Sequence, residues 1–203
     1  MPPPQPTVTT PFGLLANLAG LLTAIGLGAL VLVQRLPPPP PTPAATAAPD
    51  LVPCVMDRDG YWRGRVSGAG TLDLDWRGAA LTCAGDARPG GRGLRLYFAG
   101  HPTASPERLL LILGIAAGID DLAGREYPVS STLVDEARNL FFHDPGGRCF
   151  AQVNTVVPLS ARPRSWRVDG ELYCAGALAA VGGAQSVSIG DTAWSGRLTL
   201  AED

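Results

Sequence analysis

The chain has 203 residues and a formal net charge of -2, and all of its basic residues are arginines because lysine is absent. A weakly acidic chain offers neither the basic surface of a nucleic-acid-binding protein nor a polybasic membrane patch. Hydrophobic residues make up 46% of it, which indicates a folded chain, whereas 25 Gly and 20 Pro predict many turns and few long helices. We therefore expect one mainly β domain in addition to any membrane segment.

An uncharged apolar segment, Phe12–Val33, lies near the N-terminus. As an α-helix its 22 residues would extend roughly 33 Å, enough to cross the hydrocarbon core of a bilayer. The alternative is a cleaved signal peptide, but residues 1–11 contain no basic residue, and the nearest small-residue cleavage site is far downstream at residues 45–48. We expect a short tail at residues 1–11 and a retained transmembrane helix at residues 12–36.

Small residues recur at every fourth position of this segment, which places them on one face of the expected helix. The face consists of Ala16, Gly20, Ala24 and Gly28, with Asn17 beside it. In a bilayer, small residues let two helices pack closely, and an Asn side chain can hydrogen-bond across the interface. Chance recurrence is the alternative, since Ala and Gly are common in this chain. We expect the face to pack against other integral membrane proteins.

A proline-rich segment at residues 37–50 follows the apolar segment. Prolines favour an extended polyproline conformation, so we expect a semi-rigid spacer in front of a domain at residues 51–203.

Two signals disagree about the side of the membrane on which this domain lies. Arg35, at the end of the apolar segment, favours the cytoplasm under the positive-inside rule. Four cysteines without a CxxC spacing are instead typical of disulfides in an oxidising compartment. The bias toward Arg, Ala, Gly and Pro is typical of a GC-rich bacterial genome. We expect a single-pass protein of a bacterial inner membrane with its C-terminal domain in the periplasm.

Alternation of apolar and polar residues with a period of two dominates the domain and predicts at least six half-buried strands. It is clearest at residues 72–77, 94–98, 166–172 and 194–200. The expected fold is an antiparallel β-sandwich or an open barrel.

In two further segments of the domain, the secondary structure is predicted from signals other than alternation. Residues 105–119 begin with Ser-Pro-Glu, as a helix would, but Gly114 and Gly118 weaken a helix, so we favour a buried strand. The sequence Asp-Pro-Gly-Gly at residues 144–147 is typical of a turn, and it predicts a hairpin between residues 140–142 and a strand starting near Arg148.

The expected disulfide pairing follows from strand register. Folding the chain about a turn centred near residues 161–162 sets Cys149 opposite Cys174, within disulfide range. Cys54 then pairs with Cys83, which a turn at residues 67–70 permits. The alternative is four reduced cysteines in a cytosolic domain.

The sequence contains no motif for catalysis, metal binding or cofactor binding. His101 and His143 are its only histidines and lie far apart, no GxSxG or SxxK pattern occurs, and residues 68–70 are too short for a phosphate loop. Residues 57–60 fit a turn better than a calcium loop. Among the tryptophans, only Trp62, next to a tyrosine, is kept as a candidate exposed site, since the others lie in apolar phases.

These patterns predict a non-enzymatic accessory subunit of a larger membrane assembly. Its expected partners are the bilayer and other integral membrane subunits, and we expect it to bind neither a cofactor nor nucleic acid. The alternative is a tethered periplasmic binding module for a small ligand, glycan or cation. A concave apolar pocket with converging polar groups would favour the binding module. A flat apolar patch without a pocket would favour docking.

Overall fold

The computed structural model describes residues 50–68, 70–102 and 107–201. The expected transmembrane helix at residues 12–36 and the spacer at residues 37–49 lie outside the described residues. So does the expected packing face of that helix, which consists of Ala16, Asn17, Gly20, Ala24 and Gly28. Within the part that is described, no helix is long and apolar enough to cross a membrane.

The described part is mainly β, with antiparallel strands and two short 3-10 helices, η1 (Gly78–Ala80) and η2 (Ile119–Asp121). The strands are β1 (Val52–Pro53), β2 (Tyr61–Ser67), β3 (Thr71–Arg77), β4 (Thr82–Ala87), β5 (Leu94–Gly100), β6 (Leu109–Ile115), β7 (Arg125–Asp135), β8 (Leu140–Pro158), β9 (Ser165–Cys174), β10 (Leu178–Ala180), β11 (Ser186–Ile189) and β12 (Thr192–Thr199).

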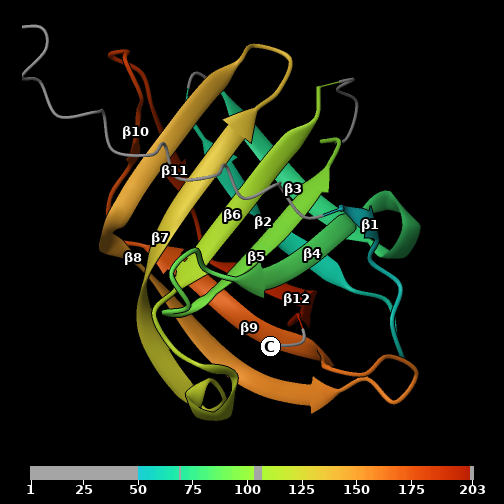
Figure 1. The fold of residues 1–203 in the computed structure, drawn as a ribbon. Coiled ribbons are helices and arrows are strands. Elements are labelled where there is room, and N and C mark those ends of the chain that lie inside the picture. The colour runs from blue at the N-terminus through green and yellow to red at the C-terminus, as the bar shows by residue number, and fades with distance from the viewer. Residues whose placement is uncertain (1–49, 69, 103–106, 202–203) are drawn as a thin grey trace, which may run out of the picture. The chain divides into compact units, whose positions relative to one another are not determined.

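All of these strands belong to one hydrogen-bonded sheet, drawn in Figure 1. Its order is β1-β4-β5-β6-β7-β8-β10-β11-β2-β12-β9, with β3 beside β2. The long strand β8 pairs with β7, and on its other edge it pairs first with β10 and then with β9. From β4 to β9 each strand therefore pairs with the next one along the chain, which is the simplest antiparallel arrangement.

The sheet curls over on itself, because strands that are distant in its order meet through their side chains. The ring of Phe98 on β5 lies 4.9 Å from that of Trp62 on β2 and 5.8 Å from that of Trp194 on β12, measured between centroids. The indole N–H of Trp76 on β3 donates a hydrogen bond of 2.7 Å to the carbonyl of His101, just past β5. The core thus lies between the two halves of the sheet.

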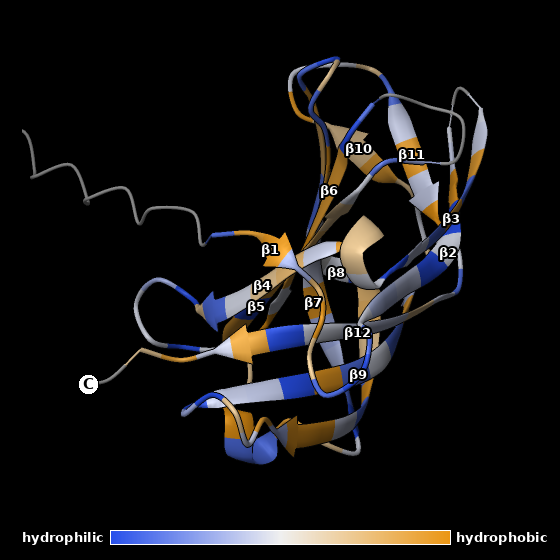
Figure 2. Ribbon diagram, turned by 90° about the vertical axis from the view of Figure 1, so that its right-hand side faces the viewer, coloured by the Kyte–Doolittle hydropathy of each residue, from blue (hydrophilic) through white to orange (hydrophobic). Residues whose placement is uncertain are grey.

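Hydrophilic and hydrophobic residues alternate along the strands, as Figure 2 shows, and the apolar phase faces this core. Trp62 is fully buried, so the prediction that it forms an exposed site is wrong. Its strand alternates inward Trp62 and Val66 with outward Arg63 and Arg65, and both neighbouring strands place a tryptophan opposite Trp62.

Two glycines let the aromatic core rings pack directly on the backbone. A β-carbon at Gly170 would come within 2.5 Å of the Trp194 indole, and one at Gly196 would come within 2.6 Å of the Phe98 ring. Because these glycines lie on the adjacent strands β9 and β12, both rings can sit close to the sheet.

The strand favoured within residues 105–119 is present as β6, whereas Ser105 and Pro106 lie outside the described residues. Leu109, Leu111 and Leu113 are almost fully buried, and the intervening side chains are half-buried. A strand covered on both faces carries a continuous apolar run, which explains why this segment also resembled a helix.

The predicted hairpin at residues 144–147 is wrong, because β8 continues through this segment in one direction. The register between β7 and β8 shifts here, so the segment forms a bulge. A carboxylate oxygen of Asp144 accepts hydrogen bonds from the backbone N–H groups of Gly147 (3.1 Å) and Arg148 (3.0 Å). These bonds give backbone N–H groups of the bulge a hydrogen-bond acceptor. The turn residues therefore bend the strand without reversing it.

The two disulfides expected from the sequence are present, one joining Cys54 to Cys83 and the other joining Cys149 to Cys174. Cys149 and Cys174 are directly paired in the β8–β9 ladder. The backbone N–H of Cys54 donates to the carbonyl of Leu81, just before β4, which brings it beside Cys83.

Candidate functional site

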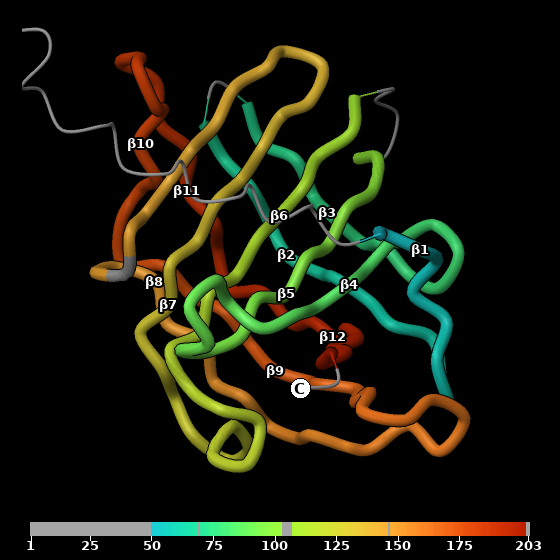
Figure 3. The backbone as a smooth tube through the Cα atoms, in the orientation of Figure 1, coloured from blue at the N-terminus to red at the C-terminus, as the bar shows by residue number. Residues whose placement is uncertain are grey.

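A cavity of about 700 Å³ opens at one end of the sheet. The ends of the strand pairs β2–β3, β5–β6, β7–β8 and β10–β11 gather there, at the upper end of Figure 3. Its walls are mainly apolar and include Val66, Leu72, Leu109, Leu133, Phe142 and Val187. This volume is typical of pockets that hold small organic ligands.

The cavity exists because the inward side chains become smaller toward this end of the sheet. On β2 and β3, the directly paired residues Trp62 and Trp76 fill the core. Four residues further along the ladder the paired side chains are Val66 and Leu72, and the turn beyond them contributes glycines to the lining. Aliphatic side chains leave space that two indoles would fill.

The rim of the cavity carries an ordered group of charged side chains. The carboxylate of Asp135, only 8% exposed, accepts a hydrogen bond from the backbone N–H of Arg138 at 3.0 Å and lies 3.6 Å from its guanidinium. The same guanidinium lies 3.0 Å from the carboxylate of Glu107. Asn139, with a φ of 52°, closes this turn in the left-handed region that Asn tolerates. The rim therefore combines two carboxylates with one guanidinium beside apolar walls.

A second charged group lies on the face of β9 and β12 that points away from the core. Asp169 accepts hydrogen bonds from the guanidinium groups of Arg58 (3.0 Å) and Arg167 (3.2 Å) and from the hydroxyl of Thr155. Arg167 also pairs with Asp57. Because Arg58 and Asp57 belong to the loop between β1 and β2, the group fastens this loop to the sheet.

These contacts set the pKa of Asp169. Burial alone would raise the pKa of its carboxyl group, but the hydroxyl groups of Ser195 and Thr155 and the guanidinium of Arg167 together more than offset the burial and hold the pKa below its usual value. Ser195 lies directly opposite Asp169 in the ladder, although its hydroxyl makes no hydrogen bond of regular geometry. The hydrogen bond from Arg167 likewise lowers the pKa of Asp57.

The structure distributes the residues singled out in the sequence over different places. The four cysteines form disulfides and do not line the cavity, and the expected helix-packing residues lie outside the described part. His143 contacts the hydroxyl of Thr132 at 2.9 Å. Among the described residues, no three His, Cys, Asp or Glu side chains are grouped as metal ligands would be.

The cavity residues were not predicted from the sequence. The apolar wall residues are ordinary inward-facing residues of their strands, so the alternation assigns them to the core. The available signal was the change from tryptophan to smaller residues along β2 and β3, but it has meaning only once the strand register is known.

A comparison of the chain with known protein families, curated proteins and solved structures finds no match.

Proposed function

We propose that this protein is a tethered binding module for a small, predominantly apolar ligand with one polar end, which enters the cavity at the open end of the sheet. The observation that carries the proposal is the combination of about 700 Å³ of space, apolar walls and a charged rim. Walls of this kind bind a ligand by removing apolar surface from water, and a few placed polar groups orient it.

The rim supports a polar end that donates hydrogen bonds. Asp135 and Glu107 supply carboxylate oxygens, and Arg138 is held between them. Since two carboxylates accompany one guanidinium, a hydroxyl, amide or ammonium group suits the entrance better than a second anion.

The proposed setting is the outer side of a bacterial inner membrane, with the apolar segment at residues 12–36 as the anchor. Two disulfides support an oxidising compartment. The apolar segment is long enough to span a bilayer and the proline-rich spacer follows it.

Docking on a larger membrane assembly, the other function expected from the sequence, stays a prediction. Its support would be a large flat apolar surface. In the described part, the exposed large apolar side chains are Val52, Val55, Phe141, Tyr173 and Val181, which form small groups at most. A concave cavity was the feature expected to favour the binding module, and for this reason we propose binding.

The test is titration of the full-length chain in nanodiscs of neutral lipid with N-phenyl-1-naphthylamine, an apolar fluorophore whose emission increases in a dry site. Empty nanodiscs supply the background signal. We expect saturable binding to the wild type at one site per chain. Val187→Trp, which fills part of the cavity from β11, should weaken this binding at least tenfold.

Val181→Trp is the matched control, because the same substitution is made at a side chain that is 71% exposed and does not line the cavity. It should bind the fluorophore as the wild type does. Equal binding by all three forms, or no saturable binding to the wild type, would remove the support for the proposed function.

A further inference from the structure

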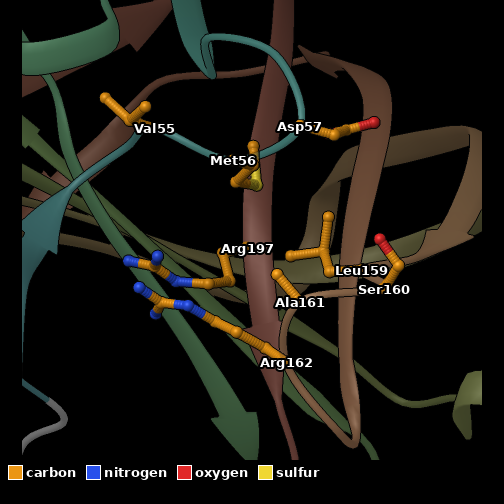
Figure 4. Close-up of a pocket in the computed structure, with 8 residues that line it drawn as sticks. All are labelled: Val55, Met56, Asp57, Leu159, Ser160, Ala161, Arg162 and Arg197. Atoms are coloured by element: carbon orange, nitrogen blue, oxygen red, sulfur yellow. The ribbon is translucent and has the colours of Figure 1, made fainter.

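A second pocket, of about 270 Å³, lies on the charged side of the domain. Its walls come from the loop that contains Val55, Met56 and Asp57, from the turn between β8 and β9, and from Arg197 on β12 (Figure 4). This volume is too small for a drug-sized molecule but sufficient for a small anion with a short organic body.

Two guanidinium groups lie side by side in this pocket, as Figure 4 shows. One belongs to Arg197, which is only 4% exposed, and the other belongs to Arg162 in the β8–β9 turn. Arg197 donates a hydrogen bond of 3.2 Å to the carbonyl of Cys83, which fixes its position and leaves other N–H groups of its guanidinium available.

Within the described residues, neither of these arginines forms an ion pair with a carboxylate. Among the described residues that line the pocket, Asp57 is the only acidic one, and it is paired with Arg167. Buried charges in proteins are usually paired, so a buried guanidinium beside a second positive charge is an unusual arrangement.

The electrostatics of the two arginines also indicate that a counter-charge is missing. Burial lowers the pKa of the Arg197 guanidinium, and the positive charge of Arg162 lowers it further. An anion between the two groups would relieve both effects, because it supplies the missing counter-charge and accepts hydrogen bonds from two planar donors.

We propose that Arg162 and Arg197 form a binding site for a small oxyanion, either a carboxylate or a phosphoryl group, whose organic part contacts Met56 and Leu159. Two neighbouring guanidinium groups can engage two oxygens of either group at once. The site is lined by different residues from the large cavity, so the inference does not depend on the proposed function.

Calorimetric titration of the full-length chain with sodium phosphate and with sodium benzoate, at constant ionic strength, tests this site. We expect saturable binding of at least one of the two anions, and the tighter one identifies the ligand class. Arg162→Gln should weaken that binding at least tenfold. Arg162 is exposed, so its replacement leaves the core intact.

Arg164→Gln is the control, because it removes an equal charge from an exposed arginine of the same turn that does not line the pocket. It should change the affinity less than twofold. Equal weakening by both variants would indicate general surface charge and overturn the proposal, as would the absence of saturable binding to the wild type.

The acidic residues Glu202 and Asp203 follow β12 in the sequence and could supply the anion themselves. The variant E202Q/D203N separates this case from an external ligand. We expect it to bind phosphate or benzoate as the wild type does. Binding that is detected only in this variant would overturn the proposal of an external oxyanion.

Discussion

Asp169 is the residue whose surroundings make the most specific prediction about stability. Its carboxylate is 9% exposed and accepts hydrogen bonds from two arginines and a threonine. Removal of this carboxylate takes a hydrogen-bond acceptor from two guanidinium groups and a hydroxyl, and it leaves the buried Arg167 with only the half-exposed Asp57 as its counter-charge, which costs more than the loss of an exposed pair.

Asp169→Asn should therefore lower the free energy of unfolding by roughly 3 kcal/mol at pH 7. Because the pKa of the folded-state carboxyl lies below the usual 3.8, the stabilisation is fully present above this pH and is lost as the pH falls through the folded-state value. The difference between wild type and variant should accordingly shrink below about pH 4. Denaturant unfolding at several pH values, followed by tryptophan fluorescence, measures this difference.

Asp73→Asn is the matched control for this experiment. Asp73 pairs with Arg65 at 2.7 Å, but both side chains are more than 60% exposed. An exposed pair of this kind contributes at most about 1 kcal/mol, so the control should be close to the wild type at every pH. An equal loss in both variants would contradict the role assigned to burial.

At the scale of single elements, the local sequence pattern was sufficient to predict strands with an alternating or a continuous apolar pattern. The alternation in β3, β5, β9 and β12 and the apolar run of β6 depend on neighbours in the sequence, and the pairing of Cys149 with Cys174 depends on one hairpin. The bulge at Asp144 was mistaken for a hairpin because the same turn residues serve both structures. The cavity and the Arg162–Arg197 pair escaped prediction because each joins distant segments.

The disulfides make a prediction at this scale. Cys149 and Cys174 are separated by 25 residues, and closure of a loop of this length should stabilise the domain by about 3.5 kcal/mol. The double variant C149A/C174A should lose about this amount in denaturant unfolding. The Cys54–Cys83 bond closes a loop with a sequence separation of 29, so C54A/C83A should lose nearly the same amount. A loss below about 1 kcal/mol in both would contradict a stabilising role.

At the scale of the whole molecule, the described residues from Asp50 onward form a compact unit by themselves. We expect a fragment of residues 51–203 to fold without the preceding segments when both disulfides are formed, because the strands, the core and the cavity all belong to this unit. Near-ultraviolet circular dichroism and a cooperative thermal transition would detect the fold. A fragment with oxidised cysteines and no near-ultraviolet signal would contradict this prediction.

Methyl NMR is the most direct test of whether the cavity binds an apolar ligand. The full-length chain would carry ¹³C-labelled Leu and Val methyl groups and would be titrated with N-phenyl-1-naphthylamine. We predict saturable shifts at Leu109, Leu133 and Val187, which line the cavity, and unchanged signals at Leu81 and Leu198, which are fully buried elsewhere in the core. Unchanged methyl signals at the cavity, or shifts confined to other methyl groups, would contradict the proposed binding.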